Sequence, residues 1–325
     1  MNQQLAFGID IGGTTSKWAL VDRDGHVLYS SSCSTTEPKN VEEFVAGLAA
    51  QMKQAYEKYG KGAELKGIGI GSPNGNYLTG NIELPPNLPW GDNVPITALF
   101  QKEFNLPVKL TNDANAAACG ELFYGKYSPP LKNFILITLG TGLGSGIVVD
   151  GKLLHGAHGM AGELGHITAY DDGRLCGCGL KGCLEAYVSA IGIHRTFFEL
   201  LEESSEPSKL RGINAKECDM VMIYNAAISG DAIALEAFRK SGELLGRRLA
   251  NSVAHLQPEV ILLCGGLMKG QALFLPAAQE AFEKSLFPVY RGKVTIQATK
   301  SGGENLAVLG AAALIWESDC LSGFV

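Results

Sequence analysis

The sequence predicts an α/β protein built from two similar lobes, and two observations support this prediction. One pattern occurs twice, at residues 7–22 and 135–150, and each copy reads as an apolar strand, a turn of glycine and threonine, and a second apolar strand. A glycine turn, at Asp24-Gly25 or at Gly151, then leads toward a third strand. In addition, the length of 325 residues exceeds the usual size of one domain, so two lobes are expected.

Between the two copies, the spacing of apolar residues predicts alternating helices and strands. Residues 41–59 carry apolar side chains at helical spacing, with Asn40 and Glu43 placed like a capping box and Gly60 as a stop. The segments that follow are predicted as a buried strand at 67–71, a helix at 94–104, a strand at 108–110 and an alanine-rich helix at 114–123.

After the second copy, the pattern predicts helices around 184–201 and 232–256, a buried strand at 260–263, a helix from about residue 271, a strand at 293–297 and a closing helix at 305–316. Two facing lobes of this kind are typical of actin-like ATPases and hexokinases. We therefore predict a two-lobed actin-like/hexokinase (ribonuclease H-like) ATPase fold, with a cleft between the lobes in which two turns hold a nucleotide.

The composition excludes several classes of protein. The net charge is −6 and the longest basic run is Arg247-Arg248, so a nucleic-acid partner is disfavoured. The N-terminus lacks the basic segment of a signal peptide, and no apolar stretch reaches the length of a membrane span. Eight cysteines, several in apolar settings, indicate reduced thiols in a soluble cytoplasmic protein.

The most specific local pattern is a histidine followed by three cysteines. Cys176, Cys178 and Cys183 stand in a C-x-C-x4-C spacing behind His166. Three thiols and one imidazole form a tetrahedral set suited to Zn²⁺, and a closed site of this kind is structural. The alternative, free thiols or a labile disulfide, is less favoured because a C-x-C pair is too cramped to bridge itself easily.

This segment resembles the signature of the ROK family (repressors, uncharacterised open reading frames and sugar kinases). The shared frame is E-x-G-H … C-x-C-G-x-x-G-C-x-E, from Glu163 to Glu185, and the resemblance extends from the first strand almost to the last helix. It implies a small lobe of residues 1–116, joined by a C-terminal helix at about 305–325, and a large lobe of 117–304 with the zinc loop and nucleotide-binding turns. It also implies a homodimer or homotetramer.

Two glycine turns are candidates for binding ATP. Backbone N–H groups of such turns donate to phosphate oxygens, and a strand-end carboxylate can hold Mg²⁺ through water. Alone, the first turn could be an ordinary hairpin, but the presence of a second such turn favours nucleotide binding. Neither turn fits a Walker P-loop or a Rossmann fingerprint. Gly265-Gly266 resembles the adenosine-contacting turn of the family, although a plain strand-to-helix turn would look alike. The predicted nucleotide and magnesium residues are Asp10, Gly12, Gly13, Thr14, Thr15, Lys17, Gly140, Thr141, Gly142, Gly144, Gly265 and Gly266.

Asp113 is the predicted catalytic base. A carboxylate at the end of a strand can accept a proton from a sugar hydroxyl that attacks the γ-phosphate. The alternative is a helix N-cap, which favours the same residue types. The stretch from Asn112 to Ala117 resembles the N-D-x-N-A-A motif of ROK kinases, in which this aspartate is the base, and so favours catalysis. Asn115 in the same motif can equally be a packing residue.

Polar side chains are predicted to bind the hydroxyl groups of a sugar. Glu163 and Glu185 supply acceptors, and His166 can ligate zinc with one nitrogen while donating toward the sugar with the other. Asn87 lies in a segment that resembles the family's N-L-x-W sugar contact. Ser72, Asn74 and Asn112 complete the candidates, although turn chemistry alone would explain Ser72 and Asn74. The set contains no cationic clamp for a sugar phosphate, which favours a free sugar.

Together the resemblance implies a transferase, an ATP-dependent hexokinase most like ROK glucokinases. It would phosphorylate the primary hydroxyl of a free hexose, with the conversion of glucose to glucose 6-phosphate as the preferred reaction. This implies a role in carbohydrate metabolism, in glycolysis. Allose, mannose, fructose and N-acetylmannosamine stay open as substrates. A ROK sugar sensor or repressor without its DNA-binding domain and an actin- or chaperone-like ATPase are the rivals; the first is disfavoured because the first strand begins within a few residues of Met1. Loss of zinc is expected to damage sugar binding and to spare the ATP site.

Overall fold

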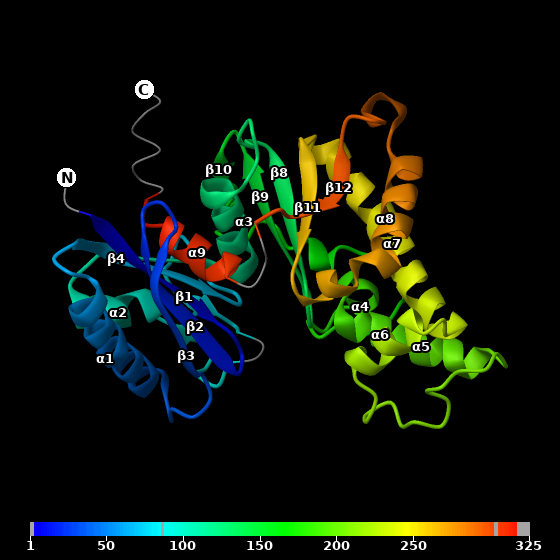
Figure 1. Cartoon of the computed structure of the whole chain (residues 1–325), viewed down its shortest axis with the longest axis horizontal. Helices are drawn as coiled ribbons and strands as arrows, with labels where there is room; N and C mark the ends of the chain where they lie inside the picture. Colours follow the sequence, from blue (N-terminus) through cyan, green and yellow to red (C-terminus); the bar gives the residue numbers. More distant parts are fainter. Residues whose placement is uncertain (1–2, 86–87, 302–304, 317–325) are drawn as a thin grey trace. The chain divides into compact units, whose positions relative to one another are not determined.

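The chain forms two compact units in a computed structural model, which describes residues 3–85, 88–301 and 305–316 (Figure 1). Unit 1 comprises Met1–Lys132, Gly146–Gly162 and Lys300–Val325, and unit 2 comprises Asn133–Ser145 and Glu163–Thr299. These limits differ from the expected lobes of 1–116 and 117–304. The helix after residue 112 belongs to unit 1 because it packs on the C-terminal helix, and the segment 146–162 also groups with unit 1.

The sheet of unit 1 has five strands in the order β3-β2-β1-β4-β7. β1 pairs antiparallel with β2, and β2 with β3, whereas β1, β4 and β7 run parallel. The carboxyl ends of the three parallel strands therefore meet at one edge. The strands are β1 (Gln4–Ile11), β2 (Thr15–Asp22), β3 (Val27–Ser34), β4 (Glu64–Ser72) and β7 (Val108–Asn112).

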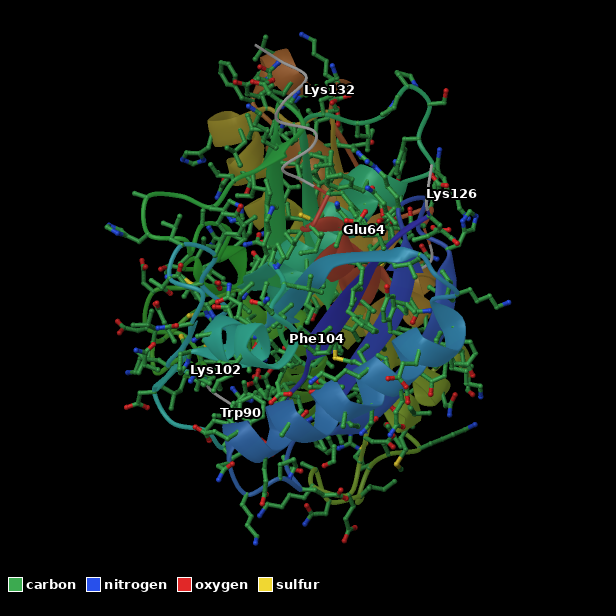
Figure 2. The ribbon with its side chains drawn as sticks, turned by 90° about the vertical axis from the view of Figure 1, so that its left-hand side faces the viewer. Glu64, Trp90, Lys102, Phe104, Lys126 and Lys132 are labelled. Atoms are coloured by element: carbon green, nitrogen blue, oxygen red, sulfur yellow. The ribbon has the colours of Figure 1, made fainter. Side chains whose placement is uncertain are left out.

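Two helices, α1 (Val41–Tyr59) and α2 (Ile96–Phe104), share one apolar core with this sheet. Asn40 caps α1, since its side chain accepts the N–H of Glu43, which confirms the predicted start. In the core, the Phe7 ring lies 6.1 Å from that of Phe104 at the end of α2, and the ring of Trp90 packs on that of Phe44 in α1. Phe104 and Trp90 are labelled in Figure 2. A small hairpin, β5 (Ile82–Glu83) and β6 (Asn93–Val94), precedes α2.

Helices α3 (Asp113–Tyr124) and α9 (Leu306–Ala313) pack on each other, and α9 lies against β1 and β4. The approach is close enough to require glycine, because a Cβ on Gly69 of β4 would overlap the carbonyl oxygen of Ala311. The alanine-rich composition of both helices permits this packing. It holds the start of α3 at the carboxyl edge of the sheet.

The second sheet repeats the first, with five strands in the order β10-β9-β8-β11-β12. In each sheet the strand that comes first in the chain is central. The second and third strands lie in turn on one side of it, and the fourth and fifth lie in turn on the other side. The predicted duplication and the two-lobed actin-like α/β fold are thus confirmed. The strands are β8 (Phe134–Leu139), β9 (Leu143–Val149), β10 (Lys152–Leu153), β11 (Val260–Cys264) and β12 (Thr295–Ala298).

Unit 2 contains α4 (Glu185–Val188), α5 (Ala190–Glu203), α6 (Met220–Ile228), α7 (Ala232–Leu256) and α8 (Gln271–Ser285), with short 3₁₀ turns at Leu164–His166, Gly266–Gly270 and Pro288–Tyr290. The single helix predicted at 184–201 is wrong. Ser189 has an extended backbone and caps α5 by accepting the N–H of Gly192, so the chain forms two helices there. In the described part of the chain no single helix is long and apolar enough to cross a membrane, although the bent pair of α6 and α7 passes that test together.

Candidate active site

Two carboxyl groups meet at the carboxyl edge of the first sheet. Asp10 near the end of β1 pairs with Gly71 of β4, and Ser72 pairs with Asn112 at the end of β7, which brings Asp10 close to Asp113. Burial raises the pKa of Asp10 to about 6, the nearby Asp113 carboxylate adds to that rise, and Lys17 opposes it. Lys17 faces Asp10 because the two residues are cross-strand partners in the β1–β2 hairpin.

At the start of α3, the N-cap is Asn112 and not Asp113. The Oδ1 atom of Asn112 accepts the N–H of Ala114 at 2.9 Å. Asp113 is already the first helical residue, although its Oδ1 also accepts that N–H at 2.8 Å. Burial raises the pKa of Asp113, and hydrogen bonds from backbone N–H groups oppose the rise. A carboxyl group of raised pKa in a rigid position suits a general base.

The first glycine turn, residues 12–15, connects β1 to β2 beside these carboxyl groups. Thr14 and Thr15 are exposed, and Thr14 accepts the N–H of Thr35 through its carbonyl oxygen. Gly12 and Gly13 are partly exposed and leave the backbone accessible. The turn therefore offers hydroxyl and N–H donors next to Asp10.

The other sugar candidates of unit 1 have local roles in the structure. Ser72 is buried, and its hydroxyl donates to the carbonyl of Pro73. Asn74 has a φ of 52° and donates to the carbonyl of Leu84, in keeping with the alternative of turn chemistry. Asn87 lies outside the described residues. Substrate contact by these residues stays a prediction.

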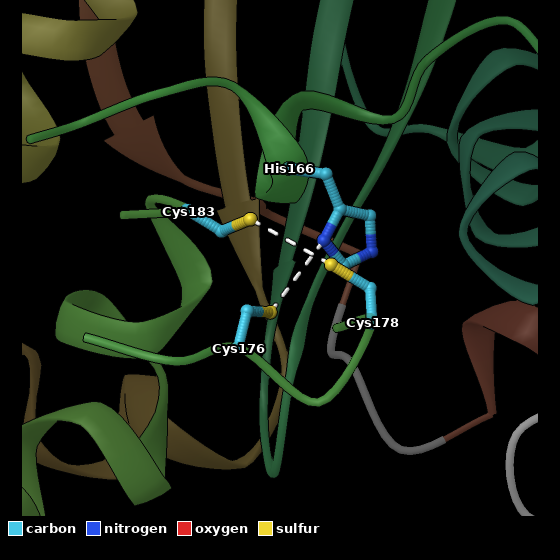
Figure 3. A group of neighbouring side chains, drawn as sticks. All are labelled: His166, Cys176, Cys178 and Cys183. Atoms are coloured by element: carbon cyan, nitrogen blue, oxygen red, sulfur yellow. Dashed lines mark hydrogen bonds between the residues drawn. The ribbon is translucent and has the colours of Figure 1, made fainter. Parts of the chain in front are cut away.

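In unit 2, His166, Cys176, Cys178 and Cys183 bring one ligand atom each within 4.8 Å of one another (Figure 3). The Sγ atoms of Cys178 and Cys183 lie 3.7 Å apart, and Sγ of Cys176 lies 3.8 Å from Nδ1 of His166. Tetrahedral ligands bound about 2.3 Å from one ion lie about 3.7 Å from each other, so the four side chains fit Zn²⁺. All three cysteines are free, and the spacing is far longer than a disulfide bond of about 2 Å.

The three thiols of the cluster differ in how readily they ionise: the pKa of Cys183 is raised mainly by burial, whereas in Cys178 burial is outweighed by hydrogen bonds, which lower its pKa. Burial raises the pKa of the Cys176 thiol to about 12, and the neighbouring Glu185 carboxylate adds to the rise. Thiolates bind metal, and a bound divalent cation deprotonates such a thiol. The cluster therefore has the donors of a closed structural zinc site, with no ligand position for substrate.

The two glutamates beside the metal cluster are held differently. Glu163 is exposed, and its carboxylate lies 3.9 Å from Nε2 of His166, on the side of the ring that faces away from the cysteines. Glu185 instead accepts the N–H of Leu143 at 2.8 Å through Oε2, and its Oε1 lies 3.6 Å from Sγ of Cys176. The contact of Glu185 with Leu143 was not predicted, because nothing in the sequence indicates which distant backbone group a carboxylate will bind.

The second glycine turn, residues 140–144, lies beside the Gly265-Gly266 turn. The strands before them, β8 and β11, are parallel neighbours that pair Thr138 with Cys264, so both turns leave the same sheet edge. Thr141, Gly265 and Gly266 are exposed, and Gly265 has a φ of 99°. Two adjacent turns with accessible backbone suit the phosphate chain of a nucleotide and the ribose attached to it.

A cavity of about 320 Å³ adjoins Gly266, and its other lining residues were not among those predicted from the sequence. Its walls are mostly apolar and come from α6, α7 and the 3₁₀ turn at Gly266–Gly270; they include Tyr224, Phe238 and Leu267. An apolar cavity beside a glycine turn suits an adenine ring. The signal available in the sequence was the apolar run at residues 220–224, which is too continuous for one buried helix face; in the structure Val221 of this run is 62% exposed.

Arg174 braces the metal loop, which we define as residues 166–185. Its guanidinium donates to the carbonyls of Ala186 and Gly192, to Thr196 and to Glu199, and it stacks 4.5 Å from the Tyr187 ring. Arg174 was not among the residues predicted from the sequence. Its signal was a single arginine between the ligating histidine and the first cysteine.

The chain is similar to known proteins over almost its whole length. The chain matches the ROK family over residues 6–318. It is 35% identical to a glucokinase of Halalkalibacterium halodurans over 89% of this chain and 88% of the relative, and 31% identical to a xylose repressor of Caldicellulosiruptor bescii over 97% and 78%. The crystal structure of a ROK family glucokinase from Streptomyces griseus in complex with glucose and AMPPNP has a TM-score of 0.78, with 30% identity over 96% of this chain and 99% of that one. The chain belongs to the ROK family.

Proposed function

We propose that the protein is an ATP-dependent hexokinase that transfers the γ-phosphoryl group of ATP to the primary hydroxyl of glucose. The observation that carries the proposal is the pair of carboxyl groups, Asp10 and Asp113, at the edge where three parallel strands end. The likeness to glucokinases, including one bound to glucose and an ATP analogue, supports the choice of donor and acceptor.

In the proposed reaction Asp113 is the general base. Its carboxylate accepts the proton of the sugar hydroxyl as that oxygen attacks phosphorus and the bond to ADP breaks. A raised pKa makes the carboxylate a better proton acceptor. Asn112 orders the helix start and keeps the Asp113 carboxyl group in place.

The residues at this edge fit Mg²⁺, which prefers carboxylate and water oxygens. Asp10 would hold the ion, and when bound the ion neutralises charge on the phosphates. Without a cation, Asp10 and Asp113 repel each other, which is one cause of the raised pKa of Asp10. Lys17 stabilises the ionised form of Asp10.

The two turns of unit 2 and the cavity beside Gly266 are the proposed nucleotide site of that unit. Residues 140–144 would bind phosphate through backbone N–H groups, and the apolar walls around Tyr224 would hold adenine. The turn at residues 12–15 would add the donors of unit 1. The expected cleft between the lobes stays a prediction.

For the sugar, we propose Glu163, His166 and Glu185 as ligands, with zinc as a structural ion of the metal loop. His166 directs Nδ1 to the cysteines and Nε2 toward Glu163, so a single ring can serve both the ion and the sugar. We further propose that the enzyme works in the cytoplasm at the start of glycolysis, as a homodimer or homotetramer.

The likeness to a xylose repressor supports one alternative, a sugar sensor that does not transfer phosphate. An ADP-release assay across glucose, allose, mannose, fructose and N-acetylmannosamine separates the two. We expect glucose to stimulate ADP release most strongly, with a higher kcat/KM than for the other sugars. Sugar binding by calorimetry without ADP release from any sugar would instead favour the sensor.

A further inference from the structure

We propose that Glu185 is a positioning residue that couples the metal loop to the second glycine turn, so that metal binding controls the affinity for nucleotide in the absence of sugar. The proposal rests on the nucleotide role proposed for residues 140–144. It concerns unit 2 alone, since the metal loop and this turn both lie there.

One carboxylate spans the two sites. Oε2 of Glu185 accepts the N–H of Leu143 at 2.8 Å, and Oε1 lies 3.6 Å from Sγ of Cys176, a metal-ligand candidate. Glu185 also follows Cys183, a second ligand candidate, by only two residues and begins α4. An ion held by Cys183 would therefore fix the backbone two residues before Glu185, and with it the position from which the Glu185 side chain reaches Leu143.

The turn is shaped to receive this carboxylate. A Cβ on Gly142 would lie 2.5 Å from Oε2 of Glu185, so the turn accepts the carboxylate only with glycine at that position. With the N–H of Leu143 bound to Glu185, the turn is held in one orientation, with the exposed Thr141 at its tip. A fixed turn binds phosphate without first paying the entropy of ordering.

Three further contacts join the same segments. The N–H of Ala190, at the start of α5, donates to the carbonyl of Gly140 at 2.9 Å, and the N–H of Leu164 donates to Oγ of Ser145 at 3.3 Å. Gly165 lies directly against the carbonyl of Leu143. The segments that carry the metal ligands thus flank the turn on both of its ends, and Glu185 is the charged contact among them.

This arrangement changes one expectation from the sequence, that loss of zinc spares the ATP site. Releasing the ion frees the loop, and the hydrogen bond from Leu143 to Glu185 then has to be formed at the cost of ordering that loop. Nucleotide and metal are consequently linked, and each should increase the affinity of the other by the same factor.

The test is titration of the zinc-loaded, full-length protein with Mg·AMPPNP by calorimetry, without sugar, for wild type, Glu185→Ala and Glu185→Gln. We expect Glu185→Ala to weaken binding about tenfold, the effect of losing a hydrogen bond to a charged group. Gln keeps an acceptor oxygen for Leu143 and should stay within about threefold of wild type. Glu199→Ala is the matched control, because it removes a carboxylate that pairs with Arg174 of the metal loop but is not bonded to the turn.

A second arm removes zinc from wild type and from Glu185→Ala with a chelator, and elemental analysis confirms the loss. Zinc removal should weaken AMPPNP binding in wild type and have little further effect in Glu185→Ala, because both changes remove the same link. Equal AMPPNP affinity in wild type and Glu185→Ala, with and without zinc, would overturn the coupling. Failure of wild type to bind AMPPNP at all would instead contradict the nucleotide site itself.

Discussion

At the scale of single residues, the proposed chemistry depends on the placement of two carboxyl groups. The sequence located Asp10 and Asp113 at predicted strand ends, since strand patterns can be read locally. It did not show that they are close, because that depends on the register of β1, β4 and β7. It also left open whether Asp113 caps its helix, and the structure assigns the cap to Asn112.

Asp113→Asn tests the proposed base. The amide keeps the size of the side chain and can still accept the N–H of Ala114, so the fold and the sugar affinity should be retained. Loss of the proton acceptor should lower kcat by about 10²–10⁴-fold. Steady-state kinetics and sugar titration measure the two effects, with Asn112→Asp as the neighbouring control. Turnover near that of wild type would refute the assignment.

Asp10→Asn should change how stability depends on pH. The folded-state pKa of Asp10 is about 6, whereas the ordinary value in an unfolded chain is about 4. Between these values the folded state binds more protons than the unfolded state, so this group lowers the free energy of unfolding as the pH rises through the window. The difference in the free energy of unfolding between Asp10→Asn and wild type should therefore be about 1–2 kcal/mol more favourable to the variant at pH 7.5 than at pH 4.

Thermal or denaturant unfolding of wild type and Asp10→Asn at the two pH values measures this difference. The variant should also lose most of its response to Mg²⁺, whereas wild type should lose that response only as the pH falls below about 6. A variant that is less stable than wild type at pH 7.5 would show that the Asp10 carboxylate is a structural ion-pair partner.

At the scale of elements, the hairpins, the first helix and the grouping of His166 with three cysteines were predictable because each depends on residues close in sequence. The break at Ser189 was missed, since a serine cap inside an apolar helical pattern leaves the pattern intact. The grouping of Glu185 with Leu143 and of Arg174 with α5 could not be predicted, because these contacts join segments that are distant along the chain or that meet only when the loop folds.

Arg174→Met should destabilise the metal loop. The change leaves the carbonyls of Ala186 and Gly192 without the guanidinium donor, which should cost about 2–3 kcal/mol in the free energy of unfolding. Arg195→Met is the control, because among the described residues Arg195 donates to a single carbonyl, that of the exposed Leu175. Denaturant unfolding of the zinc-loaded variants compares the two, and equal effects would mean that Arg174 is not the main brace.

Elemental analysis of the purified protein should find one zinc ion per chain, and Cys178→Ser should lose it. Cys178 is the exposed member of the cluster, so its substitution disturbs the packing least. Sugar affinity should fall with metal content, because His166 and Glu185 lose their fixed positions. A metal-free wild type that binds sugar and turns over fully would identify the thiols as ordinary cysteines.

At the scale of the whole molecule, two sheets with the same strand order explain why one sequence pattern occurs twice. Each copy leaves a glycine turn at a sheet edge, with carboxyl groups beside the first turn and the metal loop beside the second. The duplication was therefore the most informative feature for the fold. The function depends on the side chains that distinguish the copies.

The central claim is that phosphate leaves ATP for a sugar and not for water. The most direct measurement follows ADP and glucose 6-phosphate together, with Mg·ATP, in the presence and absence of glucose. The account predicts that ADP forms only slowly without glucose, and that with glucose one glucose 6-phosphate appears for each ADP. ADP formation at the same rate with and without sugar, and without sugar phosphate, would contradict it and identify an ATPase of the same fold.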